Sequence, residues 1–304
     1  MFDNFAPFSI TTQDNPPVLI KGLQSPPSNP PLPPLLLLHG FPQTRHIWHR
    51  LAPRLADKYT LVLPDIRGYG ESSKPPSVEA FVKSIMAKDM ITLMETLGHR
   101  TFFVCAHDRG ARIAHKMLVD HPDRVKRAIL LDICPTLAMY EGTTQAFATA
   151  YFHWFFLIQP YPLPETLISA APRKFAELYM RGHGGGGDDD DQTSIFNSEC
   201  FETYARMFED PDTVHAMCND YRAAATLDLD QQRDDITHGR LIKSPVRVLW
   251  GKKGVVEECF EPVKEWKAVA EKDVSVDGYA VDSGHYIPEE APGDVVSAVL
   301  EFLV

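Results

Sequence analysis

The sequence lacks the features that would place the chain in a membrane or on a secretory route. No apolar run approaches the roughly 18 residues that a membrane-spanning helix needs. The first residues hold no basic stretch followed by an apolar one, so we expect no secretory signal and a cytoplasmic location. The five cysteines are odd in number and form no close pair, so we expect neither a disulfide framework nor a metal site.

Positive charge is scarce as well, because 30 lysines and arginines stand against 41 aspartates and glutamates, for a formal net charge of -11. This balance argues against nucleic acid or an anionic membrane surface as a partner. It also makes a local pair of arginines more informative, because the overall field disfavours the binding of an anion. With 304 residues, 44% hydrophobic and 23% charged, the composition fits one large α/β domain with an insertion.

One stretch, residues 101–116, organises the rest of the chain. Residues 102–105 are aromatic and β-branched, as in a buried strand, and helical spacing follows a short turn. A strand that becomes a helix within about three residues, with small side chains around the turn, is the pattern of a nucleophile elbow. The elbow usually carries a serine, whereas this chain has Asp108 between Ala106 and Gly110. We therefore predict that Asp108 is a carboxylate nucleophile; the alternative is an aspartate that only caps the helix.

Strand-like and helical segments alternate along most of the sequence. This alternation predicts an α/β fold, with a mostly parallel eight-stranded sheet covered by helices on both faces. Residues 138–231 break the alternation, because they are helical in pattern and rich in aromatic side chains. We expect them to form a helical cap inserted after the sixth strand, between core segments 1–137 and 232–304. Within the cap, the Gly/Asp-rich stretch 182–191 is interpreted as a solvated surface insertion rather than a metal site.

A His39-Gly-Phe41 turn follows an early apolar strand. In a fold with a nucleophile elbow, such a turn supplies one backbone N–H of an oxyanion hole, and the residue after the nucleophile supplies the other. The predicted donors are therefore the backbone N–H groups of Phe41 and Arg109. The glycine-containing loop after the next strand, with Asp65 and Arg67, is interpreted as rigid architecture that is held by an Asp–Arg pair beneath the site.

The partners of the nucleophile are expected later in the chain. His285, in a Gly-His-Tyr sequence after the last strand, is the predicted base, because the order of nucleophile, acid and histidine is that of this type of triad. No aspartate follows the strand that ends at Trp250, where the acid usually stands. Asp132, at the end of an earlier core strand, is the favoured acid, and Glu257 and Glu258 are the alternatives.

An aspartate nucleophile restricts the reaction type. A carboxylate is a poor attacker of esters, but it can displace a leaving group from saturated carbon and so form an alkyl ester of Asp108. Water activated by His285 would then cleave that ester at its carboxyl carbon, with the oxyanion hole acting in this second half. The chemistry therefore narrows to cleavage of a carbon–halogen bond or opening of an epoxide.

Six motifs spread over nearly the whole chain carry a family resemblance. They are Met1-Phe-Asp-Asn-Phe5, His39-Gly-Phe-Pro-Gln-Thr44, His107-Asp-Arg-Gly-Ala-Arg112, Asp132-Ile-Cys-Pro-Thr136, Phe152-His-Trp-Phe155 and Asp220-Tyr-Arg-Ala-Ala-Ala-Thr226. Together they resemble the fluoroacetate dehalogenases, which belong to the α/β-hydrolase superfamily beside haloalkane dehalogenases and epoxide hydrolases. The resemblance implies an α/β-hydrolase fold, a small-molecule 2-haloacid such as fluoroacetate or chloroacetate as substrate, no cofactor, and a homodimer.

The resemblance also implies binding roles for five residues. Arg109 and Arg112, three apart at the start of the elbow helix, match the family's clamp for the substrate carboxylate, and guanidinium groups suit bidentate binding of a carboxylate. His153, Trp154 and Tyr221 match the family's halide pocket and offer an imidazole N–H, an indole N–H and a phenol O–H. A poor leaving group such as fluoride needs several such donors in place before reaction.

Two other functions stay open at this point. Epoxide hydrolases carry two cap tyrosines that protonate the epoxide oxygen, and Tyr151 with Tyr221 or Tyr204 could fill that role. Their substrates are usually neutral and would not require the arginine pair. The second alternative is an inactive hydrolase fold that acts as a binding protein, and the complete predicted triad speaks against it.

Overall fold

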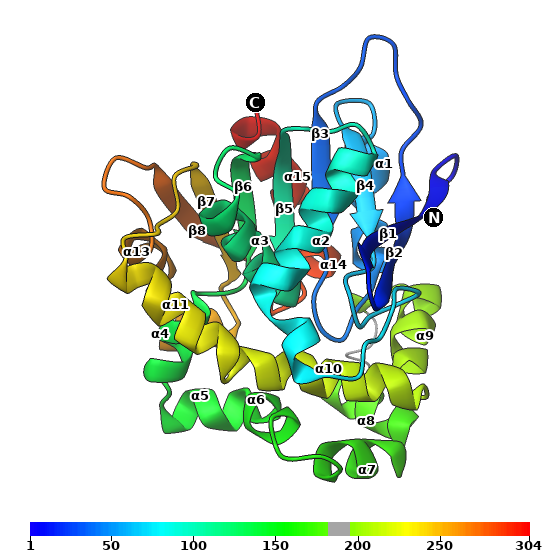
Figure 1. Ribbon diagram of the computed structural model, residues 1–304, viewed down its shortest axis with the longest axis vertical. Coiled ribbons are helices and arrows are strands. Elements are labelled where there is room, and N and C mark those ends of the chain that lie inside the picture. Colours follow the sequence, from blue (N-terminus) through cyan, green and yellow to red (C-terminus); the bar gives the residue numbers. More distant parts are fainter. Residues whose placement is uncertain (182–194) are drawn as a thin grey trace.

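The computed structural model describes residues 1–181 and 195–304, and its centre is a sheet of eight strands (Figure 1). The strands are β1 (Ala6–Asp14), β2 (Pro17–Gln24), β3 (Pro34–Leu38), β4 (Thr60–Pro64), β5 (Phe102–His107), β6 (Val125–Leu131), β7 (Val246–Gly251) and β8 (Val276–Val281). Their order across the sheet is β1-β2-β4-β3-β5-β6-β7-β8. Only the pairings of β2 with β1 and β4 are antiparallel, so the predicted mostly parallel eight-stranded sheet is confirmed.

Helices belong either to the core or to the insertion. The core helices are η1 (Arg45–Trp48), α1 (Ala52–Leu55), η2 (Val78–Phe81), α2 (Lys83–Thr96), α3 (Asp108–Asp120), α12 (Val255–Cys259), α13 (Pro262–Ala268), α14 (Ile287–Glu290) and α15 (Pro292–Phe302). The inserted helices are α4 (Thr136–Glu141), α5 (Gln145–Ala150), α6 (Phe152–Leu157), α7 (Leu163–Ser169), α8 (Pro172–Arg181), α9 (Ser198–Met207), α10 (Pro211–Ala224) and α11 (Leu227–Thr237).

The central strands are apolar on both faces, which explains their continuous hydrophobic runs. In β3, Leu36 and Leu38 join the apolar cluster that includes side chains of α2, α3 and α13. Leu35 and Leu37 point the other way and join the cluster that includes side chains of α1 and α15. Because successive side chains of a strand alternate between faces, both faces are buried only if every residue is apolar. The run of leucines is therefore what a fully covered strand requires.

The helices α4 to α11 lie between β6 and β7 in the chain, and Figure 1 shows them gathered below the sheet, at one end of its strands. The helical insertion after the sixth strand is thus confirmed. The division at residues 138 and 231 stays a prediction. The Gly/Asp stretch 182–191 lies outside the described residues.

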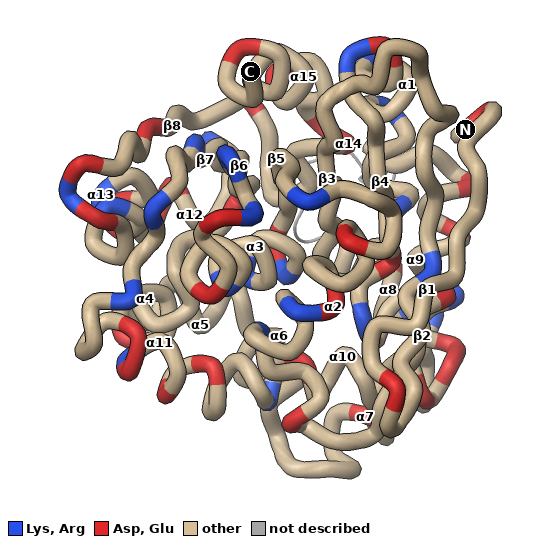
Figure 2. The backbone as a smooth tube through the Cα atoms, turned by 45° about the horizontal axis from the view of Figure 1, so that its top comes forward, with Lys and Arg blue, Asp and Glu red and all other residues tan. Residues whose placement is uncertain are grey.

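Charged residues of both signs are scattered over the strands and helices rather than separated (Figure 2). Nowhere in the described part of the chain is a helix long and apolar enough to cross a membrane. Some charged side chains are nevertheless fully buried, among them Lys83, Arg109 and Asp220. These buried charges surround the site described next.

Candidate active site

Asp108 lies at the junction of β5 and α3 in a strained backbone conformation. Its φ of 46° falls in the left-handed region, which a side chain other than glycine rarely adopts. Two glycines allow the neighbouring turn to approach it. A β-carbon on Gly110 would lie 2.4 Å from the carbonyl oxygen of His39, and one on Gly40 would lie 2.5 Å from Oδ1 of Asp108. This crowded, strained turn has the geometry of a nucleophile elbow with aspartate at its apex.

We expect Gly110→Ala to lower both stability and activity. The added methyl group would also meet the backbone oxygen of Leu38 at 2.7 Å, and backbone cannot move aside as a flexible side chain can. Overpacking of this kind costs about 1–3 kcal/mol, which chemical denaturation can measure. Gly293→Ala is the matched control, because nothing lies within 4 Å of its added β-carbon. Equal stability of the two variants would contradict the close approach at the elbow.

The backbone N–H of Phe41 donates a hydrogen bond of 2.9 Å to Oδ1 of Asp108. The first predicted oxyanion donor thus points at the nucleophile. The backbone nitrogen of Arg109, the second predicted donor, faces the same turn, because a β-carbon on Gly40 would lie 2.9 Å from it. Two N–H groups beside the carboxylate are suited to stabilise the oxyanion that would form when an ester of Asp108 is attacked by water.

His285 and Asp132 are in direct contact. Nδ1 of His285 lies 2.6 Å from Oδ2 of Asp132, and the backbone N–H of Gly251 donates to the other carboxylate oxygen at 2.9 Å. Asp132 also has a left-handed φ of 55° and is fully buried. Glu257 instead accepts a hydrogen bond from the indole of Trp250. Of the three acids considered, the structure brings Asp132 to the histidine.

The charges of Asp132, His285 and Asp108 shift the pKa values of His285 and Asp108. Burial alone lowers the pKa of His285, but the hydrogen bond and charge of Asp132 raise it above its ordinary value. Burial alone raises the pKa of Asp108, but the charge of His285 and the nearby cations lower it below its ordinary value. A carboxylate with a lowered pKa is ionised at neutral pH, as a nucleophile must be.

His107 is a site residue that the sequence analysis did not identify. Its Nε2 lies 2.8 Å from the carbonyl oxygen of His285, so Nε2 carries the hydrogen and donates it. Burial lowers the pKa of His107 to about 3, which keeps the ring neutral. The hydrogen bond fixes the backbone of the predicted base relative to the elbow. Its position directly before the nucleophile was the only signal in the sequence.

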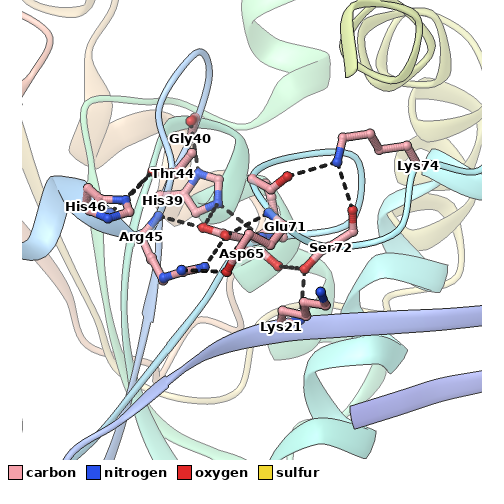
Figure 3. A network of polar contacts seen from close by, with 12 residues as sticks. Lys21, His39, Gly40, Thr44, Arg45, His46, Asp65, Glu71, Ser72 and Lys74 are labelled. Carbon is pink, nitrogen blue, oxygen red and sulfur yellow. Dashed lines mark hydrogen bonds and ion pairs between the residues drawn. The ribbon is translucent and has the colours of Figure 1, made fainter. Parts of the chain in front are cut away.

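The loop after β4 binds the segment after β3 through Asp65, which contacts Arg45 (Figure 3). The Asp65 carboxylate accepts hydrogen bonds from the backbone N–H groups of Arg45 and Glu71, and it forms an ion pair with the Arg45 guanidinium. Nε2 of His39 accepts from the backbone N–H of Ile66 at 3.0 Å. The loop is therefore tied to neighbouring backbone by hydrogen bonds, while its rigidity stays a prediction. The prediction that an Asp–Arg pair within the loop holds it is wrong, because Asp65 forms its ion pair with Arg45 and not with Arg67.

Arg67 pairs across the fold instead. Its Nε and Nη2 atoms each donate to the carboxylate of Asp89, on α2, at 2.8 Å. This contact joins the loop to the helix layer, while Asp65 joins it to the turn after β3. The loop is thus held from both sides by partners that are distant in the sequence.

Arg109 is buried and already has a counterion. Its Nε and Nη2 atoms donate to the two carboxylate oxygens of Asp220, each at 2.7 Å, and its Cζ lies 4.3 Å from the ring centre of Tyr221. Asp220 also accepts from Nζ of Lys83 at 2.5 Å and from the hydroxyl of Tyr69 at 2.9 Å. The sequence analysis missed this network, which balances the charge of Arg109 before any substrate binds.

Arg112 is buried as well, but no acidic side chain of the described residues forms an ion pair with it. Its Nη1 donates to Oγ1 of Thr136 at 2.8 Å, and its Cζ lies 4.6 Å from the ring centre of Trp154. Burial and the charge of Arg109 lower the pKa of Arg112 below its ordinary value. The charge of Arg112 is therefore available to an anion in the site.

The three predicted halide ligands gather around Phe41, whose N–H reaches the nucleophile. The ring of His153 is stacked on that of Phe41 at 5.9 Å, and the ring of Tyr221 meets it edge-on at 5.3 Å. Trp154 contacts Tyr221, with the ring centres 6.5 Å apart. In the part of the chain that the structure describes, neither the Trp154 indole N–H nor the Tyr221 hydroxyl has a hydrogen-bond partner.

The other tyrosines considered for epoxide chemistry lie differently. The hydroxyl of Tyr151 is 3.2 Å from Nδ1 of His285. Tyr204 donates to the buried carboxylate of Glu289 at 2.8 Å. Burial raises the pKa of Glu289 to about 8, so this carboxyl stays largely protonated at neutral pH. The hydroxyl of Tyr204 is therefore used in a hydrogen bond that joins the insertion to the core.

Comparisons with known proteins agree with this geometry. The family described as alpha/beta hydrolase fold matches residues 33–179. The chain is 40% identical to a fluoroacetate dehalogenase from Burkholderia sp over 274 residues, which are 89% of this chain and 87% of that protein. It is 32% identical to a soluble epoxide hydrolase from Corynebacterium sp. over 275 residues, 88% of this chain and 89% of that protein.

A solved structure supports the same assignment. The crystal structure of a putative alpha/beta hydrolase from Nostoc sp PCC 7120 superposes with a TM-score of 0.91 at 43% identity, covering 100% of this chain and 99% of that one. The fold and the family resemblance predicted from the motifs are thus confirmed, while the role of each site residue stays a prediction. The chain belongs to the alpha/beta hydrolase family, among relatives that include a fluoroacetate dehalogenase and epoxide hydrolases.

Proposed function

We propose that the protein hydrolyses the carbon–halogen bond of small 2-haloacids such as fluoroacetate or chloroacetate. The observation that carries the proposal is Arg112, a buried cation without an acidic partner among the described residues, on the helix that begins at Asp108. A buried charge without a counterion is costly unless a ligand supplies one. A substrate carboxylate supplies it, whereas a neutral substrate does not.

The first half-reaction is a displacement at carbon. The substrate carboxylate is held by Arg112 and by the part of the Arg109 guanidinium that Asp220 leaves free. One carboxylate oxygen of Asp108 attacks the carbon that bears the halogen, the carbon–halogen bond breaks with its electron pair, and halide leaves. Hydrogen-bond donors from His153, Trp154 and Tyr221 stabilise the departing halide.

The second half-reaction is hydrolysis of the resulting ester. His285, oriented by Asp132, takes a proton from water, and the hydroxide equivalent attacks the carboxyl carbon of Asp108. The backbone N–H groups of Phe41 and Arg109 stabilise the tetrahedral oxyanion. When the oxyanion collapses, the departing alkoxide oxygen takes the proton from His285 and leaves as the hydroxy acid, and the carboxyl of Asp108 loses its proton to solvent and is ionised again. None of these steps requires a cofactor.

Epoxide hydrolysis is the second candidate, and the epoxide hydrolase among the relatives favours it. It needs an acid that protonates the epoxide oxygen, for which Tyr221 is the best placed of the tyrosines considered. Tyr204 is bound to Glu289 and Tyr151 lies against the predicted base. The unpaired charge of Arg112 has no role in that reaction, so haloacid hydrolysis is the better account.

The test is to incubate the purified protein with fluoroacetate, chloroacetate and styrene oxide and to measure halide release and diol formation. We expect halide release with both haloacids and its complete loss in Asp108→Asn. Diol formation without halide release would move the function to epoxide hydrolysis. If none of the three substrates is converted, both haloacid hydrolysis and epoxide hydrolysis would be overturned. That result would favour an inactive fold that acts as a binding protein.

A further inference from the structure

Helices α3 and α11 face each other with charged side chains. On α3, Arg112 and Lys116 are one turn apart, so both lie on the same face of the helix. On α11, Asp228, Gln232 and Asp235 are buried at the corresponding spacing. All of these except Asp235 line one small cavity, together with Lys83, His115 and Thr136. A row of cations on one helix thus meets a mostly acidic row on the other.

Each cation in this region except Arg112 has a carboxylate partner. Lys116 forms an ion pair with Asp235 at 2.7 Å. Lys83 is paired with Asp228 at 3.2 Å as well as with Asp220. Arg109, one turn before Arg112, is paired with Asp220. The absence of an acid is therefore specific to Arg112 among the buried cations described here.

The residue of α11 that lines this cavity together with Arg112 and carries no charge is Gln232. Oε1 of Gln232 accepts a hydrogen bond of 2.8 Å from the backbone N–H of Leu137. Arg112 donates to the hydroxyl of the preceding residue, Thr136. Both side chains are therefore anchored at the start of α4, and a carboxylate at position 232 would fall next to the guanidinium.

The cavity that Arg112 and Gln232 line is small and contains polar atoms without hydrogen-bond partners. It has a volume of about 10 Å³, and three of its lining residues carry a buried polar atom without a hydrogen-bond partner. Two of these atoms are donors, Nε of Arg112 and Nε2 of Gln232, and the third is an acceptor, Oδ2 of Asp228, which forms no hydrogen bond but lies 3.2 Å from Nζ of Lys83 in the ion pair. A cavity of roughly 10–15 Å³ with two to four polar partners is the kind of site that holds one ordered water molecule.

We propose that Gln232 determines the preference of the site for an anionic substrate. As a neutral residue in a row of acids, it leaves Arg112 without an ion-pair partner on α11, so that the guanidinium can bind the substrate carboxylate. One water molecule in the cavity accepts hydrogen bonds from Arg112 and Gln232, donates one to Asp228, and so orients the guanidinium. Gln232 is thus a positioning residue, and its role in specificity rests on the proposed function.

Gln232→Glu tests the electrostatic part. The variant keeps an oxygen acceptor for the Leu137 N–H and adds a negative charge beside Arg112, in competition with the substrate. We expect KM for chloroacetate to rise at least tenfold while kcat changes much less, because the chemistry at Asp108 is untouched. Gln231→Glu is the matched control, since it adds the same charge one residue earlier on the same helix, and KM should stay unchanged.

A merely structural role for Gln232 would lower stability or kcat and leave KM in place, so thermal unfolding of both variants is recorded alongside the kinetics. Equal KM for wild type and Gln232→Glu would overturn the specificity role. A wild-type protein without any haloacid turnover would instead overturn the proposed function, and the substrate role of Gln232 with it.

The water is tested without any assay of activity. A high-resolution crystal structure of the wild-type protein should contain one water oxygen within hydrogen-bond distance of Arg112 Nε, Gln232 Nε2 and Asp228 Oδ2. Crystals grown in bromide should give no anomalous peak at that position. A bromide peak would show that the cavity binds an anion instead of water. A cavity without electron density would refute the proposed water molecule.

Discussion

His285→Gln is expected to stop the reaction halfway. Displacement of halide by Asp108 needs no base, so the first half-reaction should proceed and release one equivalent of halide per site. Hydrolysis of the ester needs a base for water, and loss of a general base typically lowers the rate about 10²–10⁴-fold. Turnover should therefore fall by that factor, while the ester on Asp108 accumulates.

The adduct makes this result directly observable. Mass spectrometry of acid-quenched His285→Gln after incubation with chloroacetate should find the mass of one carboxymethyl group on the peptide that contains Asp108. Asp108→Asn is the control and should give neither the halide burst nor the adduct. Steady turnover in His285→Gln at the wild-type rate would show that another group activates the water.

The wild-type pH profile follows from the same contacts. Only the neutral imidazole can accept a proton, and Asp132 raises the pKa of His285 above its ordinary value. If ester hydrolysis limits the rate, kcat should rise with pH through that raised pKa. The acidic limb of the profile should therefore lie above the pKa of an unperturbed histidine, which is about 6.5.

Local patterns made the elbow and the sheet predictable from sequence. The switch from strand to helix around Asp108 is visible in consecutive residues, and the alternation of strands and helices indicates a mostly parallel sheet. The absence of an aspartate after Trp250 likewise made Asp132 the favoured acid, with Glu257 and Glu258 as alternatives. Residues that directly follow neighbouring parallel strands are expected to lie close together, because the carboxyl ends of these strands meet at one edge of the sheet.

The charge balance of the arginines could not be predicted in this way. Arg109 and Asp220 are 111 residues apart, and nothing in either local sequence says that they pair. Arg109 and Arg112 look equivalent in the sequence, yet one has a counterion and the other has none among the described residues. The same holds for Asp65 and Arg67, which are near in sequence but bind different partners. Pairings of long side chains depend on tertiary packing, which a local pattern does not encode.

Asp220 is the residue on which this buried charge network depends most. Its carboxylate accepts hydrogen bonds from Arg109, Lys83 and Tyr69 and is fully buried. Although burial alone would raise the pKa of Asp220, the two cations lower it well below its ordinary value. The ionised form is therefore strongly favoured in the folded protein, and folding gains stability from it wherever the unfolded carboxyl is also ionised.

We expect Asp220→Asn to destabilise the fold by about 3–5 kcal/mol at neutral pH, because it leaves the buried Arg109 without a counterion and Lys83 with Asp228 alone. The amide also turns an N–H group toward donors that need an acceptor. Since the pKa is lowered by folding, the stabilisation is present above the unfolded carboxyl pKa of about 3.9 and is lost as the pH falls below it. The difference between wild type and variant in the free energy of unfolding should thus be largest above that pH and narrow under acid. Asp230→Asn, on the exposed side of α11, should unfold like wild type at every pH, and a pH-independent loss in Asp220→Asn would mean that packing rather than charge holds the network together.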